Sequence, residues 1–136
     1  MIEKKYFTLE EARTILPEVK AKLKKLITCY IKLRVNDGIL ISYDDEFENT
    51  HEEISKSLMI HEIHADFFRV LKELLEMGIY VKDPGIGLVD FYSKFNKEDI
   101  FLCYQYPEND LEYWHTLENG YNSRKHVDLL KLKGKV

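Results

Sequence analysis

The chain has 136 residues, of which 45% are apolar and 32% charged, and it contains nine Tyr, seven Phe and one Trp. This composition excludes a disordered chain, because disordered sequences of similar charge lack so many aromatic residues. The length is that of one domain, and no apolar run is long enough to cross a bilayer or to act as a signal segment. We therefore expect a single domain over residues 1–136, with no membrane partner.

The net charge of −4 is unevenly distributed. Residues 1–36 carry nine Lys and Arg against four Glu, whereas residues 37–55 carry seven Asp and Glu and no Lys or Arg. Such asymmetry can mark a nucleic-acid surface, but the charges of a basic helix and an acidic segment more often pair with each other, within the domain or across a dimer. Nucleic acid is therefore not the expected partner. The two cysteines, Cys29 and Cys103, are interpreted as reduced thiols, which predicts a cytoplasmic protein.

A first helix is predicted to begin after Thr8. The segment Thr8-Leu9-Glu10-Glu11 has the Thr-x-x-Glu pattern of a capping box, in which both side chains satisfy free backbone N–H groups. Pro17 displaces one backbone hydrogen bond, so we expect a short first helix bent into the long one near Pro17. Apolar residues recur every three or four positions in a coiled-coil-like stripe: Leu9, Ala12, Leu16, Val19, Leu23, Leu26, Tyr30 and Leu33.

A second helix is predicted from Thr50 to Met77, after an acidic connection over residues 39–49 and before a left-handed Gly78. It carries two apolar seams. One seam contains Ile54, Leu58, Ala65, Phe68 and Leu75, and the other contains Ile60, Ile63, Phe67, Leu71 and Leu74. One can pack on the first helix, and the other needs a cover from the C-terminal sheet or from a second subunit. We therefore expect a homodimer.

After Gly78 the apolar pattern alternates, which predicts strands at residues 79–81, 88–92 and 100–104, with turns at 83–85 and 96–99. The tail from Asp128 is interpreted as a short helix or a frayed end. The predicted fold class is α+β. A long antiparallel two-helix hairpin over residues 1–78 packs with a small antiparallel sheet of about three strands over residues 79–136.

His61 and His64 lie one turn apart on the predicted second helix and are candidate metal ligands. The step of three residues differs from His-Glu-x-x-His, in which the ligands are four apart and the Glu is the general base. The alternative is two histidines at a helix interface, each with hydrogen-bonding partners.

A second group of polar residues lies near the predicted strand ends. The candidate ligand-binding residues are Asp83, Asp90, Glu108, Trp114, His115 and Arg124. A carboxylate and an imidazole suffice for acid–base chemistry, and Arg can bind an anion through two hydrogen bonds. The alternative is structural: turn carboxylates, a core Trp and an Arg that pins the C-terminal segment.

Cys103 is interpreted as a small buried core residue, because nothing in the sequence places a cation beside it. Gly85-Ile86-Gly87 is not followed by a helix, so it is not interpreted as a phosphate loop. No cofactor is predicted.

Two blocks of sequence resemble domain-of-unknown-function family 2203, which is sometimes loosely labelled DivIVA-like. The first block comprises residues 6–12 and 16–19. The second comprises residues 81–84, 87–91, 102–104, 108, 114–115, 120–121 and 124, and the chain departs from the family pattern at Pro107, Ser123 and His126. The resemblance implies no established activity, but its distinctive positions include all six candidate ligand-binding residues.

Two functions are therefore open. The sequence favours a non-enzymatic interaction or scaffold domain that homodimerises through its helices, on the evidence of the double seam. The alternative is a small-ligand or metal-binding site, which could be catalytic, in the C-terminal sheet region.

Overall fold

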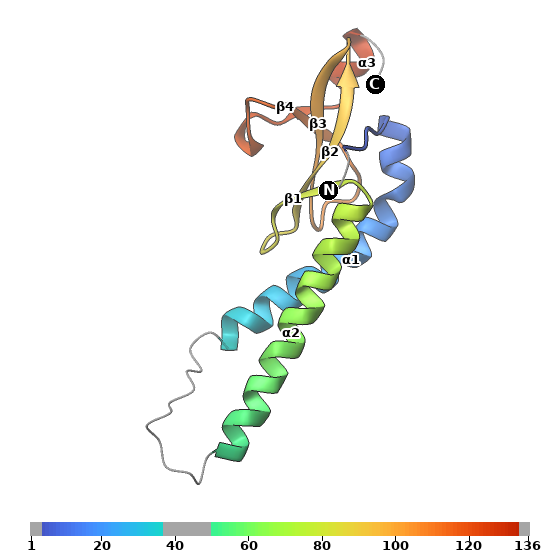
Figure 1. Cartoon of the computed structure of the whole chain (residues 1–136). Helices are drawn as coiled ribbons and strands as arrows, with labels where there is room; N and C mark the ends of the chain where they lie inside the picture. Colours follow the sequence, from blue (N-terminus) through green and yellow to red (C-terminus); the bar gives the residue numbers. More distant parts are fainter. Residues whose placement is uncertain (1–3, 37–49, 134–136) are drawn as a thin grey trace.

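The computed structural model describes residues 4–36 and 50–133, and it confirms the α+β class (Figure 1). Two long helices, α1 (Leu9–Asn36) and α2 (Thr50–Glu76), precede an antiparallel sheet of five strands in the order β1-β2-β3-β4-β5. The strands are β1 (Ile79–Asp83), β2 (Leu88–Phe95), β3 (Glu98–Gln105), β4 (Tyr113–Thr116) and β5 (Lys125–His126). A 3₁₀ turn, η2 (Tyr121–Ser123), and a short helix, α3 (Asp128–Lys133), complete the described chain.

Helix α1 begins at the predicted capping box. The backbone N–H of Glu11 donates to the Thr8 hydroxyl at 3.0 Å, and the N–H of Thr8 donates to the Glu11 carboxylate at 2.9 Å. These bonds lower the pKa of Glu11, because they stabilise its charged form. The helix continues through Pro17 as one element, without a separate short helix, and its axis curves in Figure 1. The predicted stripe is buried from Leu9 to Leu26.

Helix α2 runs antiparallel to α1 and is joined to it by an ion pair between Lys22 and Glu73 at 2.8 Å. It ends as predicted, because Gly78 has a left-handed φ of 89° that a larger residue would adopt only with strain. The second seam faces the interior, with Leu74 fully buried. The first seam, defined by Ile54, Leu58, Ala65, Phe68 and Leu75, is exposed along its whole length. The predicted connection over residues 39–49 lies outside the described residues.

The number of strands is the main correction to the predicted fold. The prediction of about three strands is wrong, since β4 and β5 extend the sheet to five. These two strands have four and two residues, which is too short for a two-residue alternation to be recognised. The turn between β2 and β3 is also tighter than predicted. Asn96 and Lys97 have φ values of 50° and 69°, as in a two-residue hairpin turn, and Glu98 already belongs to β3.

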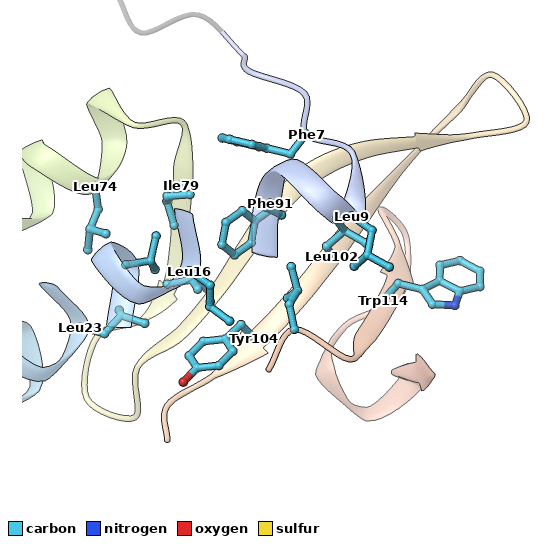
Figure 2. Close-up of a cluster of buried hydrophobic side chains, with 14 of the residues drawn as sticks. Phe7, Leu9, Leu16, Leu23, Leu74, Ile79, Phe91, Leu102, Tyr104 and Trp114 are labelled. Carbon is cyan, nitrogen blue, oxygen red and sulfur yellow. The ribbon is translucent and has the colours of Figure 1, made fainter. Parts of the chain in front are cut away.

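The hydrophobic core lies between α1 and one face of the sheet, which we call the inner face (Figure 2). Alternate residues of β2 and β3, among them Phe91, Leu102 and Tyr104, pack there against Leu16 and Leu23 of α1. The intervening residues of the same strands point to the opposite side, which we call the outer face. The two faces therefore carry different residues of the same strands.

Candidate metal centre

Three polar residues of the outer face lie on neighbouring strands. Asp90 of β2 is directly opposite Cys103 of β3, and His115 of β4 is directly opposite Phe101 of β3. Because residues on one face recur every second position, Cys103 and Phe101 are neighbours on the outer face. The register therefore brings Asp90, Cys103 and His115 together across three strands.

The side chains of these residues form a compact and almost fully buried group. The Nε2 atom of His115 lies 3.1 Å from Oδ1 of Asp90, and Nδ1 of His115 lies 2.8 Å from the carbonyl oxygen of Thr116. One nitrogen, one sulfur and one carboxylate oxygen, from His115, Cys103 and Asp90, all lie within 4.8 Å of one another. The exposed fractions of Asp90, Cys103 and His115 are 1%, 1% and 5%. Three donor atoms that suit a transition metal are thus shielded from water.

The hydrogen bonds of His115 determine its charge when no metal is bound. Both ring nitrogens face acceptors, the Asp90 carboxylate and the Thr116 carbonyl, so both donate and the ring is an imidazolium. Burial alone would lower the pKa of His115, but the hydrogen bonds with Asp90, Cys103 and Thr116 outweigh it and raise the pKa to about 10. At neutral pH His115 is therefore a buried imidazolium beside the Asp90 carboxylate.

Cys103 and Asp90 differ in how far the surrounding protein satisfies them. Burial raises the pKa of the Cys103 thiol, and its hydrogen bond with His115 opposes that increase only in part. The Oδ2 atom of Asp90 is buried and has no hydrogen-bond partner among the residues that the structure describes. A buried carboxylate oxygen without a partner is unfavourable, and a bound cation would remove that cost.

A second ion pair lies beside this group. The Arg124 guanidinium donates to the Glu108 carboxylate at 2.7 Å and to the backbone carbonyl of Cys103 at 3.3 Å, and it stacks on the Tyr113 ring at 4.1 Å. Glu108 also accepts a 2.7 Å hydrogen bond from the backbone N–H of Gln105. Arg124 thereby attaches the segment before β5 to the strand that carries Cys103.

Two of the six predicted ligand-binding residues lie elsewhere. Asp83 is exposed, and its carboxylate accepts a 2.9 Å hydrogen bond from the N–H of Gly85, so it shapes the turn after β1. Trp114 packs in the core on the inner face, on the side of the sheet opposite to His115. Of the predicted set, Asp90 and His115 form one pair and Glu108 and Arg124 the other.

The two candidate histidines of α2 are also apart from this group. His61 and His64 are both exposed on the described chain and do not lie between α1 and α2. The ring of His64 stacks on that of Phe68, with centroids 6.4 Å apart.

The sequence predicts Cys103 to be a small buried core residue; it is buried, but it lies on the outer face with His115 and Asp90. The signal that identifies it is the hairpin turn. A two-residue turn at Asn96-Lys97 places Asp90 opposite Cys103, whereas the predicted four-residue turn shifts the partner of Asp90 by two positions.

A profile for the family described as "Uncharacterized conserved protein (DUF2203)" matches residues 5–127, which is most of the chain. The protein belongs to the DUF2203 family. Asp90, Cys103 and His115 each lie in one of the short segments that carry the resemblance to DUF2203. No curated protein and no solved structure matches this DUF2203 chain.

Among the described residues of this DUF2203 protein, neither long helix has a stretch that is both apolar and long enough to pass through a bilayer.

Proposed function

We propose that this domain binds a transition-metal ion of the zinc class through Asp90, Cys103 and His115. The observation that carries the proposal is the arrangement of one imidazole nitrogen, one thiol sulfur and one carboxylate oxygen, all buried, within 4.8 Å of one another. Bond lengths of about 2.0–2.3 Å in a tetrahedral zinc site place neighbouring ligand atoms about 3.5 Å apart. Small side-chain rotations therefore suffice to close the group around an ion.

The orientation of His115 supports this proposal. Metal-binding histidines usually donate their second ring N–H to a carbonyl or a carboxylate, which leaves the other nitrogen free for the metal. In His115 the Nδ1 atom already faces the Thr116 carbonyl at 2.8 Å, so loss of the Nε2 proton leaves a lone pair directed at the group. The metal then replaces the Nε2 proton and the thiol proton, and it neutralises the unpartnered oxygen of Asp90.

The identity of the donors favours particular metals. A thiolate and an imidazole bind zinc and other borderline ions strongly, whereas magnesium and calcium prefer sets of oxygen ligands. Three protein ligands leave one position of a tetrahedral ion without a ligand from this group, and three is the number of protein ligands typical of catalytic zinc sites.

Zinc titration with a competing chromophoric chelator tests the proposal. We expect one zinc per chain in the wild type, and more than about 100-fold weaker binding in Cys103→Ser and His115→Gln, because even indirect partners of a metal site contribute 10–100-fold. Cys29→Ser is the matched control, since Cys29 lies on α1 away from the group. A double variant His61→Gln/His64→Gln separates the helical histidines from the sheet. Equal affinity of Cys103→Ser and Cys29→Ser would contradict the proposal.

A second proposed function is that of a scaffold that homodimerises through α2. The exposed first seam supports it, because Phe68 is 62% exposed and Leu58 59% exposed. His61 and Lys72 occupy the two positions that are missing from the seam. With them included, its residues alternate in steps of four and three, as in a coiled coil. Figure 1 shows that the distal halves of both helices extend away from the sheet, which leaves this seam accessible to a second copy.

Analytical ultracentrifugation over a range of concentrations tests the dimer. We expect the wild type to sediment as a dimer and Leu58→Glu/Phe68→Glu as a monomer with unchanged helix content, because the substitutions place two charges in the seam. Lys56→Glu/Arg69→Glu is the control, since it introduces the same residue type next to the seam. A wild type that stays monomeric at all concentrations would contradict the proposal.

We also propose a cytoplasmic location. A reduced Cys103 supports it, because a thiol that serves as a metal ligand must remain reduced, and the cytosol keeps thiols in that state.

A further inference from the structure

Aromatic rings and lysine ammonium groups surround the Asp90, Cys103 and His115 group on the outer face. The ring of Phe101 lies 5.4 Å from that of His115 and 4.6 Å from that of Tyr92, and the ring of Tyr80 lies 5.0 Å from that of Tyr92. We call Tyr80, Tyr92 and Phe101 the outer-face rings. They contact one another edge to face or at a tilt, in a row that ends at the imidazole of His115.

Two lysine side chains lie over the outer-face rings. The ammonium group of Lys82 lies 5.0 Å above the centre of Phe101, and that of Lys4 lies 5.0 Å above the centre of Tyr92. Lys82 and Lys4 are both exposed, whereas Tyr92 and Phe101 are only 8% and 5% exposed. Exposed lysine side chains thus lie over rings that are themselves nearly buried.

This arrangement has a chemical consequence. A cation over a ring at an exposed site is held weakly, so an incoming flat ring can displace the lysine side chain from the ring face. The displaced ammonium group then remains within reach of an anionic substituent on the incoming molecule, and it has a long, flexible stem with which to follow that substituent. The same face therefore offers both a stacking surface and positive charge.

We propose that the outer face binds a small aromatic carboxylate, whose ring stacks on the outer-face rings and whose carboxylate pairs with Lys82. This inference deepens the proposed function and rests on it in one respect: the carboxylate is directed toward the open position of the metal held by Asp90, Cys103 and His115. The stacking and the pairing with Lys82 do not depend on the metal.

Three probes of similar size separate the two contributions. Benzoate has a flat ring and a charge, cyclohexanecarboxylate has the charge without a flat ring, and benzamide has the flat ring without the charge. We expect benzoate to bind about fivefold more tightly than either of the others, because aromatic stacking and an ion pair each contribute modestly to affinity. Binding is measured by titration with NMR detection of the aromatic side-chain resonances, and those of Phe101 and Tyr92 should shift.

The matched variants are Lys82→Met and Lys56→Met, which remove the same charge from the outer face and from an exposed position of α2 outside the seam. We expect Lys82→Met to weaken benzoate binding about threefold and Lys56→Met to leave it unchanged. Equal affinities for the three probes, equal affinities in the two variants, or shifts confined to other residues would each overturn the inference.

Each titration is performed on chelator-treated protein and on protein to which zinc has been added. The predicted order of probes and variants in both samples supports the inference, and tighter benzoate binding with zinc supports the direction of the carboxylate. If zinc fails to bind but the order persists, the metal proposal fails and the stacking site stands. If zinc binds and the probes are not distinguished, the stacking site fails and the metal proposal stands.

Discussion

The inner and outer faces of the sheet are built from the same strands, and they differ in what their buried residues do. On the inner face Phe91, Leu102 and Tyr104 are buried against α1 and contribute mainly apolar packing. On the outer face Asp90 and His115 are buried almost as deeply, although burial of charged groups costs free energy unless they are paired. The comparison teaches that burial alone does not distinguish a core from a site, whereas the chemistry of the buried groups does.

The largest expected effect comes from breaking the outer-face pair in the metal-free protein. Asp90→Ala leaves the His115 imidazolium without its carboxylate partner, and we expect the free energy of unfolding to fall by about 3–5 kcal/mol. Urea denaturation at pH 7 measures it. A loss below about 1 kcal/mol would show that the pair does not hold a buried charge.

An inner-face truncation provides the counterpart. Leu102→Ala removes apolar side-chain atoms from a fully buried position, so we expect a loss of about 2–5 kcal/mol, independent of pH. Urea denaturation at pH 7 and at pH 9 measures the loss of unfolding free energy at each pH. A loss that changes with pH would mean that the two faces are coupled.

The dependence of stability on pH distinguishes the faces directly. The pKa of His115 is raised from about 6.5 in the unfolded chain to about 10 in the fold, so the fold binds the proton more tightly. Its contribution to stability is complete below about pH 6.5 and is lost as pH rises through about 10. We expect the unfolding free energy of the metal-free wild type to decrease over this range more steeply than that of His115→Gln.

Thermal or urea unfolding at several pH values measures this difference, and His115→Gln accounts for lysines and tyrosines that titrate in the same range. Parallel pH profiles of the two proteins would contradict the buried imidazolium. Zinc affinity should show the opposite dependence and rise with pH, because the metal competes with the protons of His115 and Cys103.

The smallest expected effect concerns the helix that covers the inner face. Thr8→Ala removes the hydroxyl that accepts the Glu11 N–H, and we expect a loss of about 1 kcal/mol. Thr14→Ala is the matched control, since the Thr14 hydroxyl donates to the Glu10 carbonyl within the helix and satisfies no free N–H group. Equal losses of stability in Thr8→Ala and Thr14→Ala, measured by thermal unfolding, would show that the cap does not stabilise the helix.

The sequence predicts the inner face well, because a helix or strand that packs on one side carries apolar residues at a regular spacing. The stripe of α1 from Leu9 to Leu26 and the left-handed end of α2 at Gly78 both follow from local patterns. The strands β4 and β5 could not be predicted in the same way, since their four and two residues contain too little alternation.

The candidate site was only half predictable. Asp90 and His115 were identified by residue type, but Cys103 requires the register of β2 and β3, and that register depends on whether the turn at Asn96 has two residues or four. Trp114 was grouped with its neighbour His115, yet adjacent residues of a strand point to opposite faces.

The central claim is that Asp90, Cys103 and His115 bind one metal ion, and X-ray absorption spectroscopy of the zinc-loaded protein tests it most directly. The account predicts one sulfur ligand at about 2.3 Å and nitrogen or oxygen ligands at about 2.0–2.2 Å, with the sulfur lost in Cys103→Ser and retained in Cys29→Ser. A zinc shell that contains only nitrogen and oxygen in the wild type would contradict it.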